Sequence, residues 1–340
     1  MKIGGTNVKR VAVFLAVLFW VYASCTCARA EQLDFENGQV TFFAVIEAPE
    51  GLTEARELIC EPLHLESKLM CAAFGIPEEV VVETRKINGG SQYYSCAYDD
   101  VCLNSLFPIF YSYDRESGRL LRGYTSPQAY QAAGTPELPT EHETLRLLQE
   151  MGLTLCARRS GSQMGKAVNE KMCAEAEDLQ WEKNKSGDQW HELPDDVRVS
   201  RYECVQMLEE IPLYQYARAL SGTDSFTYEC ETILYFIADE LVYFSGGVYS
   251  APVEYGEMSP LISAQCAAEI FADDYNLLVD AKKIFCDTIR LEYMIFPESG
   301  SLIYSRWRLE PVWVFYESIA GDQEHLLGGV HALTGEVIAE

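Results

Sequence analysis

The sequence predicts an α+β protein, in which antiparallel sheets carry helices on one face and form two related helix-plus-meander modules. β-rich segments outnumber helical ones, and turns rich in glycine and polar residues join many of them. One turn repeats, because Glu116-Ser117-Gly118 and Glu298-Ser299-Gly300 each precede an apolar strand, and Thr334-Gly335-Glu336 is a looser third copy. This repeat favours two related modules, although turns this short also recur by chance.

The first module is expected over residues 31–130. Its first strand is predicted at residues 39–47, where β-branched and aromatic residues dominate. Thr53 is a typical N-cap, so a helix is predicted from there through Ile59. A second apolar stretch occupies residues 63–74.

A β-hairpin is predicted next. Asn88-Gly89-Gly90 favours a tight turn, because asparagine and glycine readily adopt positive φ. Residues 80–85 and 92–98 are therefore expected to pair as its two strands. Further strands are expected at residues 107–113 and 120–124.

The second region is expected over residues 140–340, after a polar connector at 127–139 that contains prolines. Thr140 to Glu143 matches a capping box, in which the two side chains satisfy free backbone amides. A helix is predicted to follow, and another at residues 162–179. Strands are then predicted at three segments: 202–207, 226–236 and 241–244.

The last unit is expected over residues 259–340, as one helix lying across a meander of three antiparallel strands. Ser259 is a suitable N-cap, with Pro260 at the first helical position. The helix is predicted to bury four apolar side chains: Leu261, Ile262, Ala268 and Phe271. The strands are predicted at 284–295, 302–316 and 327–338, with Trp313 in the core.

Residues 1–30 have the order of a secretory signal peptide. Lys2, Lys9 and Arg10 give a positive start, and residues 11–24 are apolar and uncharged. Ala28-Arg29-Ala30 fits the small-x-small cleavage pattern. Cleavage is therefore expected after Ala30, which would release a secreted protein.

Two other interpretations of this segment stay open. Cys25 follows small residues, as in a bacterial lipobox, so a lipid anchor at Cys25 on the extracellular face of the membrane is one alternative. An uncleaved membrane anchor is the other, although the apolar run is shorter than the ~20 residues that span a bilayer.

The charge of the chain narrows the class of partner. Without residues 1–30, which hold four basic and no acidic residues, 22 Lys and Arg face 52 Asp and Glu, a net charge of −30. Such a charge repels nucleic-acid phosphates and anionic membranes, so no nucleic-acid partner is expected, and membrane contact only through the N-terminal segment. Cations, basic peptides and neutral ligands remain, although an acidic surface also simply keeps an exported protein soluble.

Ten cysteines follow residue 30, and an even number in an exported chain favours disulfides. We favour Cys204–Cys230, on consecutive predicted strands, and Cys266–Cys286, which would join the last helix to the next strand. The alternative is that several are buried thiols, Cys266 above all. No C-x-x-C or Cys/His cluster occurs, so no metal site is predicted.

No catalytic or cofactor motif stands out. The sequence has no G-x-S-x-G, H-E-x-x-H, phosphate-binding loop or dinucleotide fingerprint, and its five histidines are scattered. No catalytic residue and no cofactor are therefore predicted. The rings of Trp307, Trp313 and Phe315 fall on one face of their strands by two-residue alternation. They form either a core beneath the helix or a surface platform for a peptide or glycan.

One stretch of the last unit carries a resemblance. Pro311-Val312-Trp313 lies in one predicted strand, and the next ends in Ala332-Leu333-Thr334-Gly335-Glu336. Residues 259–340 thereby resemble the PepSY module and its YycI/YycH-type relatives, with His331 where that family often has Asp or Asn. The whole chain resembles uncharacterised exported proteins and lipoproteins of Gram-positive gut bacteria. The resemblance implies inhibition, sensing or partner binding at the cell envelope.

The sequence therefore favours an exported, non-catalytic binding or regulatory protein at the cell envelope, whose ligand is an unknown protein, peptide or glycan. The alternative is a cell-wall or glycan hydrolase without a recognisable motif. A cleft where two or more carboxyl groups have raised pKa values would favour the hydrolase, whereas a shallow aromatic groove or an open sheet edge would favour binding.

Overall fold

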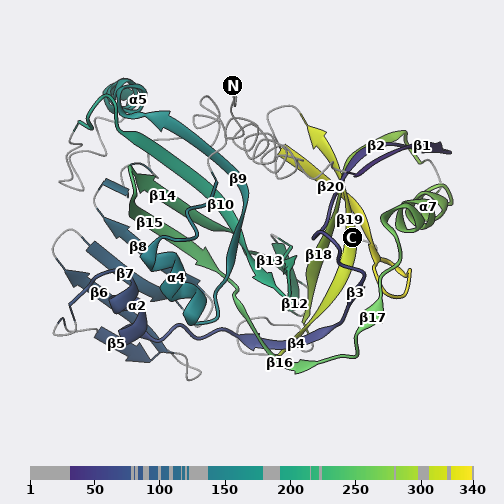
Figure 1. Cartoon of the computed structure of the whole chain (residues 1–340), viewed down its shortest axis with the longest axis horizontal. Helices are drawn as coiled ribbons and strands as arrows, with labels where there is room; N and C mark the ends of the chain where they lie inside the picture. Colours follow the sequence, from purple (N-terminus) through teal and green to yellow (C-terminus); the bar gives the residue numbers. More distant parts are fainter. Residues whose placement is uncertain are drawn as a thin grey trace, which may run out of the picture.

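The computed structural model describes residues 31–338 apart from these gaps: 78–79, 81–82, 87–91, 99–100, 107–109, 116, 119–120, 122–136, 179–191, 215, 222–223, 279–280, 298–305 and 320–322. The described residues form two large β-sheets that lie side by side (Figure 1). The predicted export segment, with Ala30 and Cys25, lies outside the described residues, as do the predicted turns at 88–90 and 298–300. No described helix is long and apolar enough to cross a membrane.

The first sheet has eight strands and carries helix α7 (Ala264–Tyr275) on one face. Its main path runs in the order β1-β2-β18-β19-β20-β21, while β4 pairs with both β16 and β19. All pairs are antiparallel except β2 with β18. The strands are β1 (Glu31–Asn37), β2 (Val40–Glu47), β4 (Leu58–Pro62), β16 (Ser250–Tyr255), β18 (Ile284–Pro297), β19 (Trp307–Ile319), β20 (Gln323–His331) and β21 (Val337–Ile338).

The second sheet has nine strands in the order β11-β10-β14-β15-β8-β7-β6-β5, and β9 lies on the other side of β10. The strands are β5 (Glu83–Lys86), β6 (Gln92–Tyr98), β7 (Val101–Leu106), β8 (Phe110–Arg115), β9 (Leu155–Met164), β10 (Arg198–Leu208), β11 (Ile211–Pro212), β14 (Thr232–Ile237) and β15 (Glu240–Gly247). Two further two-stranded pieces are β12 (Tyr216–Ser221) with β13 (Asp224–Glu229), and β3 (Glu54–Ala55) with β17 (Ser259–Pro260).

Helices cover both faces of the nine-stranded sheet. One core contains side chains of α2 (Ser67–Ala73) and α4 (Glu143–Glu150), together with Leu234 and Phe244 of the sheet. A separate core contains side chains of α5 (Gly165–Asp178), together with Tyr235 and Tyr243. Because neighbouring strand residues point to opposite faces, α5 lies across the sheet from α2 and α4. The α+β class is thus confirmed, but helices on one face only is wrong for this sheet.

The predicted C-terminal order of one helix and three antiparallel strands is present as α7, β18, β19 and β20. The helix buries Ala268 and Phe271 as expected, and Phe271 stacks on Phe315 with ring centroids 4.5 Å apart. Its N-cap is Ser263, whose hydroxyl accepts from Cys266 N at 3.1 Å, and not Ser259. The reason is that Ser259 and its neighbour Pro260 pair with β3 as strand β17.

Local signals were also misleading at the other two predicted helix N-caps, Thr53 and Thr140. The helix predicted from Thr53 through Ile59 is wrong, because this stretch supplies β3 and β4, and β4 fills a place between β16 and β19. The capping box at Thr140 is also wrong. Helix α4 begins at Glu143, and its N-cap is His142, whose Nδ1 accepts from Thr144 N at 3.3 Å.

The chain places the nine-stranded sheet as an insertion within the eight-stranded one. It leaves the first sheet after Pro62 and returns to it at Ser250 (Figure 1). Each sheet therefore combines residues from both sides of the connector at 127–139 where a module boundary was predicted. The sheets meet at β18, where the candidate site lies.

Candidate functional site

A cleft of about 710 Å³ opens where the two sheets meet. One edge of β18 changes its neighbour here. Arg290 pairs with Glu47, the last residue of β2, whereas Tyr293 forms a bridge with Leu213, just after β11. Between these two neighbours the cleft is lined by residues 47–50, by residues 156–158 of β9, by Met207, Glu210 and Pro212, and by Arg290 and Leu291.

A buried ion pair holds the two sheets together beside this cleft. Arg158 of β9 reaches across to Glu292 of β18, a side chain with 0% exposure. The Tyr316 hydroxyl donates to the same carboxylate at 2.7 Å, and Arg158 Nη2 also donates to the carbonyl of Leu213 at 3.3 Å. Burial is the largest influence and acts to lower the pKa of Arg158, but the charge of Glu292, its hydrogen bond with Arg158 and the nearby Tyr316 together raise the pKa above its ordinary value. Arg158 therefore stays charged.

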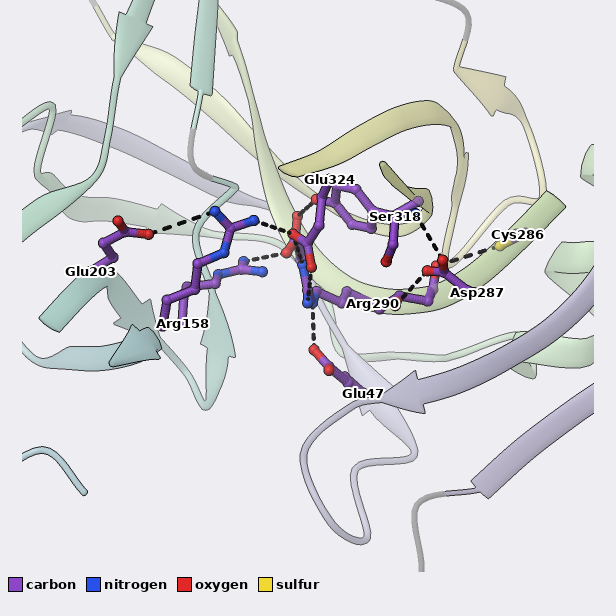
Figure 2. A network of polar contacts seen from close by, with 12 residues as sticks. Glu47, Arg158, Glu203, Cys286, Asp287, Arg290, Ser318 and Glu324 are labelled. Carbon is purple, nitrogen blue, oxygen red and sulfur yellow. Dashed lines mark hydrogen bonds and ion pairs between the residues drawn. The ribbon is translucent and has the colours of Figure 1, made fainter. Parts of the chain in front are cut away.

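Arg290 forms the second ion-pair centre, shown in Figure 2. It holds Glu324 through two parallel hydrogen bonds of 2.6 and 2.7 Å, and its Nε donates to Glu47. Arg159 lies 3.5 Å from Glu324 on the other side. Burial acts to raise the pKa of Glu324, but the hydrogen bonds and charge of Arg290 lower it below its ordinary value. Glu324 is thus held ionised.

The exposed rim of the cleft is acidic. Glu47 is 51% exposed, and Glu50 and Glu210 are also exposed. The two arginines that line the cleft already pair with carboxylates, so the solvent-facing charge there is negative. Such a rim attracts cationic groups and repels anionic ones.

Two groups at or beside the cleft are poorly suited to hydrolysis. Burial raises the pKa of the Cys156 thiol, so it is protonated near neutral pH and a weak nucleophile. A general acid needs a carboxyl group with a raised pKa, whereas that of Glu324 is lowered. Neither group is therefore suited to nucleophilic or general-acid catalysis near neutral pH.

A second cluster contains Glu57, Glu310 and His331, whose ligand atoms lie within 4.8 Å of one another. His331 Nδ1 accepts from Leu333 N at 3.1 Å and from Thr334 N at 3.3 Å. An accepting Nδ1 carries no proton, so the proton of the neutral ring is on Nε2, which faces the two carboxylates. A metal ligand would need an unprotonated Nε2, so the geometry favours a hydrogen-bonded cluster over a metal site.

The predicted aromatic platform is wrong, because all three rings are in the core. Trp307 and Phe315 have 0% exposure and Trp313 has 5%. The indole of Trp307 donates to Ser250 Oγ and that of Trp313 to Ile262 O, each at 3.0 Å. The packing of α7 on this strand face excludes a ligand, which leaves the other interpretation of the pattern, a core beneath the helix.

The structure contains neither of the predicted disulfides. Cys204 packs in the core beneath α2 and α4, whereas Cys230 packs in the core beneath α7. Cys266 is exposed on the outer face of α7, and Cys286 is buried beneath that helix. Consecutive strands and helices suggested proximity, but the side chains point into different environments.

Sequence reasoning missed the ion-pair residues at and beside the cleft because they come from distant strands. Arg158 and Arg290, which line the cleft, and Glu324, which pairs with Arg290, share no local motif. One signal was present: Arg290 and Glu292 interrupt the apolar strand Ile284–Pro297 on one face. Two charges on a strand this long and apolar indicate partners on another element.

Comparisons with known proteins agree with the fold and name no activity. No family model matches the chain, and no match was found among curated proteins. Among solved structures, the chain is similar to an uncharacterized protein from Eubacterium rectale, with 13% sequence identity and a TM-score of 0.60. The match covers 90% of this chain and 92% of that one. At this identity the likeness shows the fold alone.

Proposed function

We propose that this chain is an exported, non-catalytic binding or regulatory protein at the cell envelope, and that its ligand binds in the cleft between the two sheets. The observation that carries the proposal is an open cleft of about 710 Å³ whose two arginines, Arg158 and Arg290, are each neutralised by a carboxylate partner. Ligand pockets of this size are typical of binding sites at the junction of two structural units. The predicted signal peptide supplies the export.

The acidic rim favours a cationic or neutral ligand, such as a basic segment of a peptide or protein. Glu47 suits this role, because Arg290 keeps its two hydrogen bonds to Glu324 when Glu47 turns to another cation. A cation at Glu47 would thus leave no buried charge unpaired. An uncharged glycan would use the polar groups of the cleft without this electrostatic gain.

The resemblance to PepSY-type modules belongs to the same proposal. The unit of α7 with β18, β19 and β20 has the expected order. We propose that the meander β5 to β8, with α2, is the related second module. Modules of this kind bind through sheet faces and edges and lack a phosphate or cofactor cradle, which supports a non-enzymatic role.

A binding experiment with matched variants tests the proposal. Three peptides of equal length, one rich in lysine, one neutral and one rich in glutamate, would be titrated against the protein by fluorescence anisotropy. The test variant changes Glu47, Glu50 and Glu210 to Gln. The control variant changes Glu31, Asp34 and Glu36 of the exposed edge strand β1 to the corresponding amides, which alters net charge equally.

The proposal predicts that the lysine-rich peptide binds best and that only the cleft variant loses most of this binding. Equal losses in both variants would show general charge attraction and contradict a cleft site. Release of soluble sugar or peptide fragments from cell-wall material by the protein would contradict the non-catalytic assignment and favour the hydrolase.

A further inference from the structure

Three apolar side chains outside the cleft are exposed side by side on the first sheet. Phe43 is 53% exposed and Val45 is 38% exposed on β2, and Phe285 of β18 is 40% exposed. Phe285 pairs with Thr41, two residues before Phe43, so the three side chains form one contiguous group, which we call the apolar patch. Exposed apolar side chains that lie together, rather than singly, commonly mark an interaction site.

The apolar patch lies on the face of the sheet opposite helix α7. Successive side chains of β2 alternate between the two faces, and Phe42 and Ala44 point into the core beneath α7 with 0% exposure. On the face that carries the patch, Val314 and Tyr316 of β19 are buried with Tyr214 in a small core of their own. The patch is therefore the part of this face that remains exposed.

The patch continues into the cleft along β2. Glu47, at the rim of the cleft, is two residues beyond Val45 and four beyond Phe43, so all three side chains point to the same side of the strand. At ~3.3 Å per residue, the two apolar positions lie about 7 and about 13 Å from Glu47 along the strand. At the other end of the patch, Lys283 lies 3.8 Å from Glu36, so its charge has a partner. The acidic end of the patch is therefore the end that meets the cleft.

We propose that the cleft and the apolar patch together bind one extended peptide segment, which places a lysine or arginine at Glu47 and apolar side chains on Val45 and Phe43. The inference rests on the proposed function and narrows its ligand to a basic peptide with a fixed spacing. Side chains of an extended chain alternate, so those two and four positions from the basic residue face the sheet together with it. Contact with the patch supplies affinity that salt does not screen, whereas salt weakens the attraction to Glu47.

A second copy of this chain is the competing occupant of the patch. The chain has a net charge of −26, so a second copy would bring like charges together at the acidic end of the patch. A basic peptide is attracted by the same field. The charge of the molecule therefore favours the peptide.

The test compares two peptides of identical composition by fluorescence anisotropy. Each has a central lysine, two phenylalanines and two leucines in a background of serine. In the matched peptide the apolar residues stand two and four positions from the lysine on both sides, so the direction in which the peptide binds does not matter. In the mismatched peptide they stand one and three positions away, which turns them from the sheet when the lysine is at Glu47. The matched peptide should bind about tenfold more tightly, a ratio that burial of one large apolar side chain can supply.

Matched variants locate the contact. The double variant Phe43→Thr, Phe285→Thr removes both rings of the patch and keeps side chains that suit strands, so it should lose the preference for the matched peptide. The control variant Leu69→Thr, Tyr98→Thr removes apolar side chains of similar exposure, 48% and 44%, from α2 and β6. It should keep the preference.

Three results would overturn the proposal. Equal binding of the two peptides to the wild-type protein would do so, and the proposed function would still stand if lysine-rich peptides bound at the cleft. Failure of the wild-type protein to bind any lysine-containing peptide would overturn the proposed function as well. A wild-type dimer in analytical ultracentrifugation that the variant at Phe43 and Phe285 dissociates would assign the patch to a second copy instead. The peptide comparison uses the wild-type protein, so poor folding of a variant does not affect it.

Discussion

The ion pair between Arg158 and Glu292 gives the sharpest test of how the two sheets are joined. We consider Glu292→Gln, which keeps the size of the side chain and an acceptor for the Tyr316 hydroxyl but removes the charge. Arg158 is 11% exposed, so it would remain a buried cation without its main partner. Breaking a buried pair on one side costs about 3–5 kcal/mol of unfolding free energy. Because Glu324 also lies close enough to interact with Arg158, we expect about 3 kcal/mol.

A double-mutant cycle separates the pair from its surroundings. Arg158→Met alone should also destabilise, because it leaves the Glu292 carboxylate buried. The double variant Arg158→Met, Glu292→Gln should be more stable than either single variant, since no unpaired charge remains, and the coupling should reach about 2 kcal/mol. Urea unfolding followed by tryptophan fluorescence suits the measurement, because Trp307 and Trp313 are buried in the core of the first sheet.

The solvent-facing side of helix α4 supplies the control. Arg146 forms ion pairs with Glu143 and Glu150, and its side chain is 46% exposed. Arg146→Met should therefore cost less than about 1 kcal/mol. If Glu292→Gln costs no more than Arg146→Met, or if the double variant costs the sum of the two single ones, the buried pair does not join the sheets as argued.

Three further predictions concern other parts of the molecule. The pKa of Glu324 is lowered from its ordinary value of 4.5, so its ionised form stabilises the fold above about that pH, and this contribution is lost on acidification. In a plot of Tm against pH, Glu324→Gln should therefore lose less stability in acid than the wild-type protein does. His331→Asn should keep the turn at 331–335, because the amide oxygen can accept from the same backbone amides, whereas His331→Ala should lower the free energy of unfolding in urea by about 1 kcal/mol. Equal losses in the two variants would show that Nδ1 does not stabilise the turn. Gly38→Ala should lower the Tm of the protein more than Gly51→Ala does, because both glycines have positive φ but only at Gly38 would an added Cβ collide with a side chain, that of Asn276. Equal Tm values for the two variants would contradict this.

Patterns within one segment predicted structure well where local chemistry decides it. The hairpin of β5 and β6, the strand β2, and the order of α7 with its three strands were all visible in the sequence. The Asn37-Gly38 turn that joins β1 to β2 is an equally good local signal, because Gly38 has a positive φ. The roles of two histidines could not be predicted from the residue types that usually cap helices and turns. His142 at the N-cap of α4 and His331 in a turn both accept hydrogen bonds from backbone amides through Nδ1.

The candidate site was beyond such patterns because it depends on pairing between distant segments. The parallel pairing of β2 with β18 joins residues more than two hundred positions apart, and nothing local requires it. Other long-range pairings, of β3 with β17 and of β4 with β16 and β19, explain why the expected helix at Thr53 is replaced by β3 and β4. Aromatic alternation on β19 identified a buried face correctly but could not say whether α7 or a ligand covers it.

The break in the neighbours of β18 explains why the cleft and the ion pairs occur together. Between Arg290, which pairs with Glu47 of β2, and Tyr293, which forms a bridge with Leu213, this edge of β18 has no paired residue at Leu291 among the described residues; on its other edge Leu291 pairs with β19. The side chains on either side of that break must then connect the sheets, and arginine–carboxylate pairs do so with directional hydrogen bonds. The floor of the cleft is therefore fixed by charges that must stay paired, whereas Glu47 at its rim can exchange partners. A ligand that takes Glu47 from Arg290 gains a carboxylate without disturbing the junction, which is the physical basis for placing binding there.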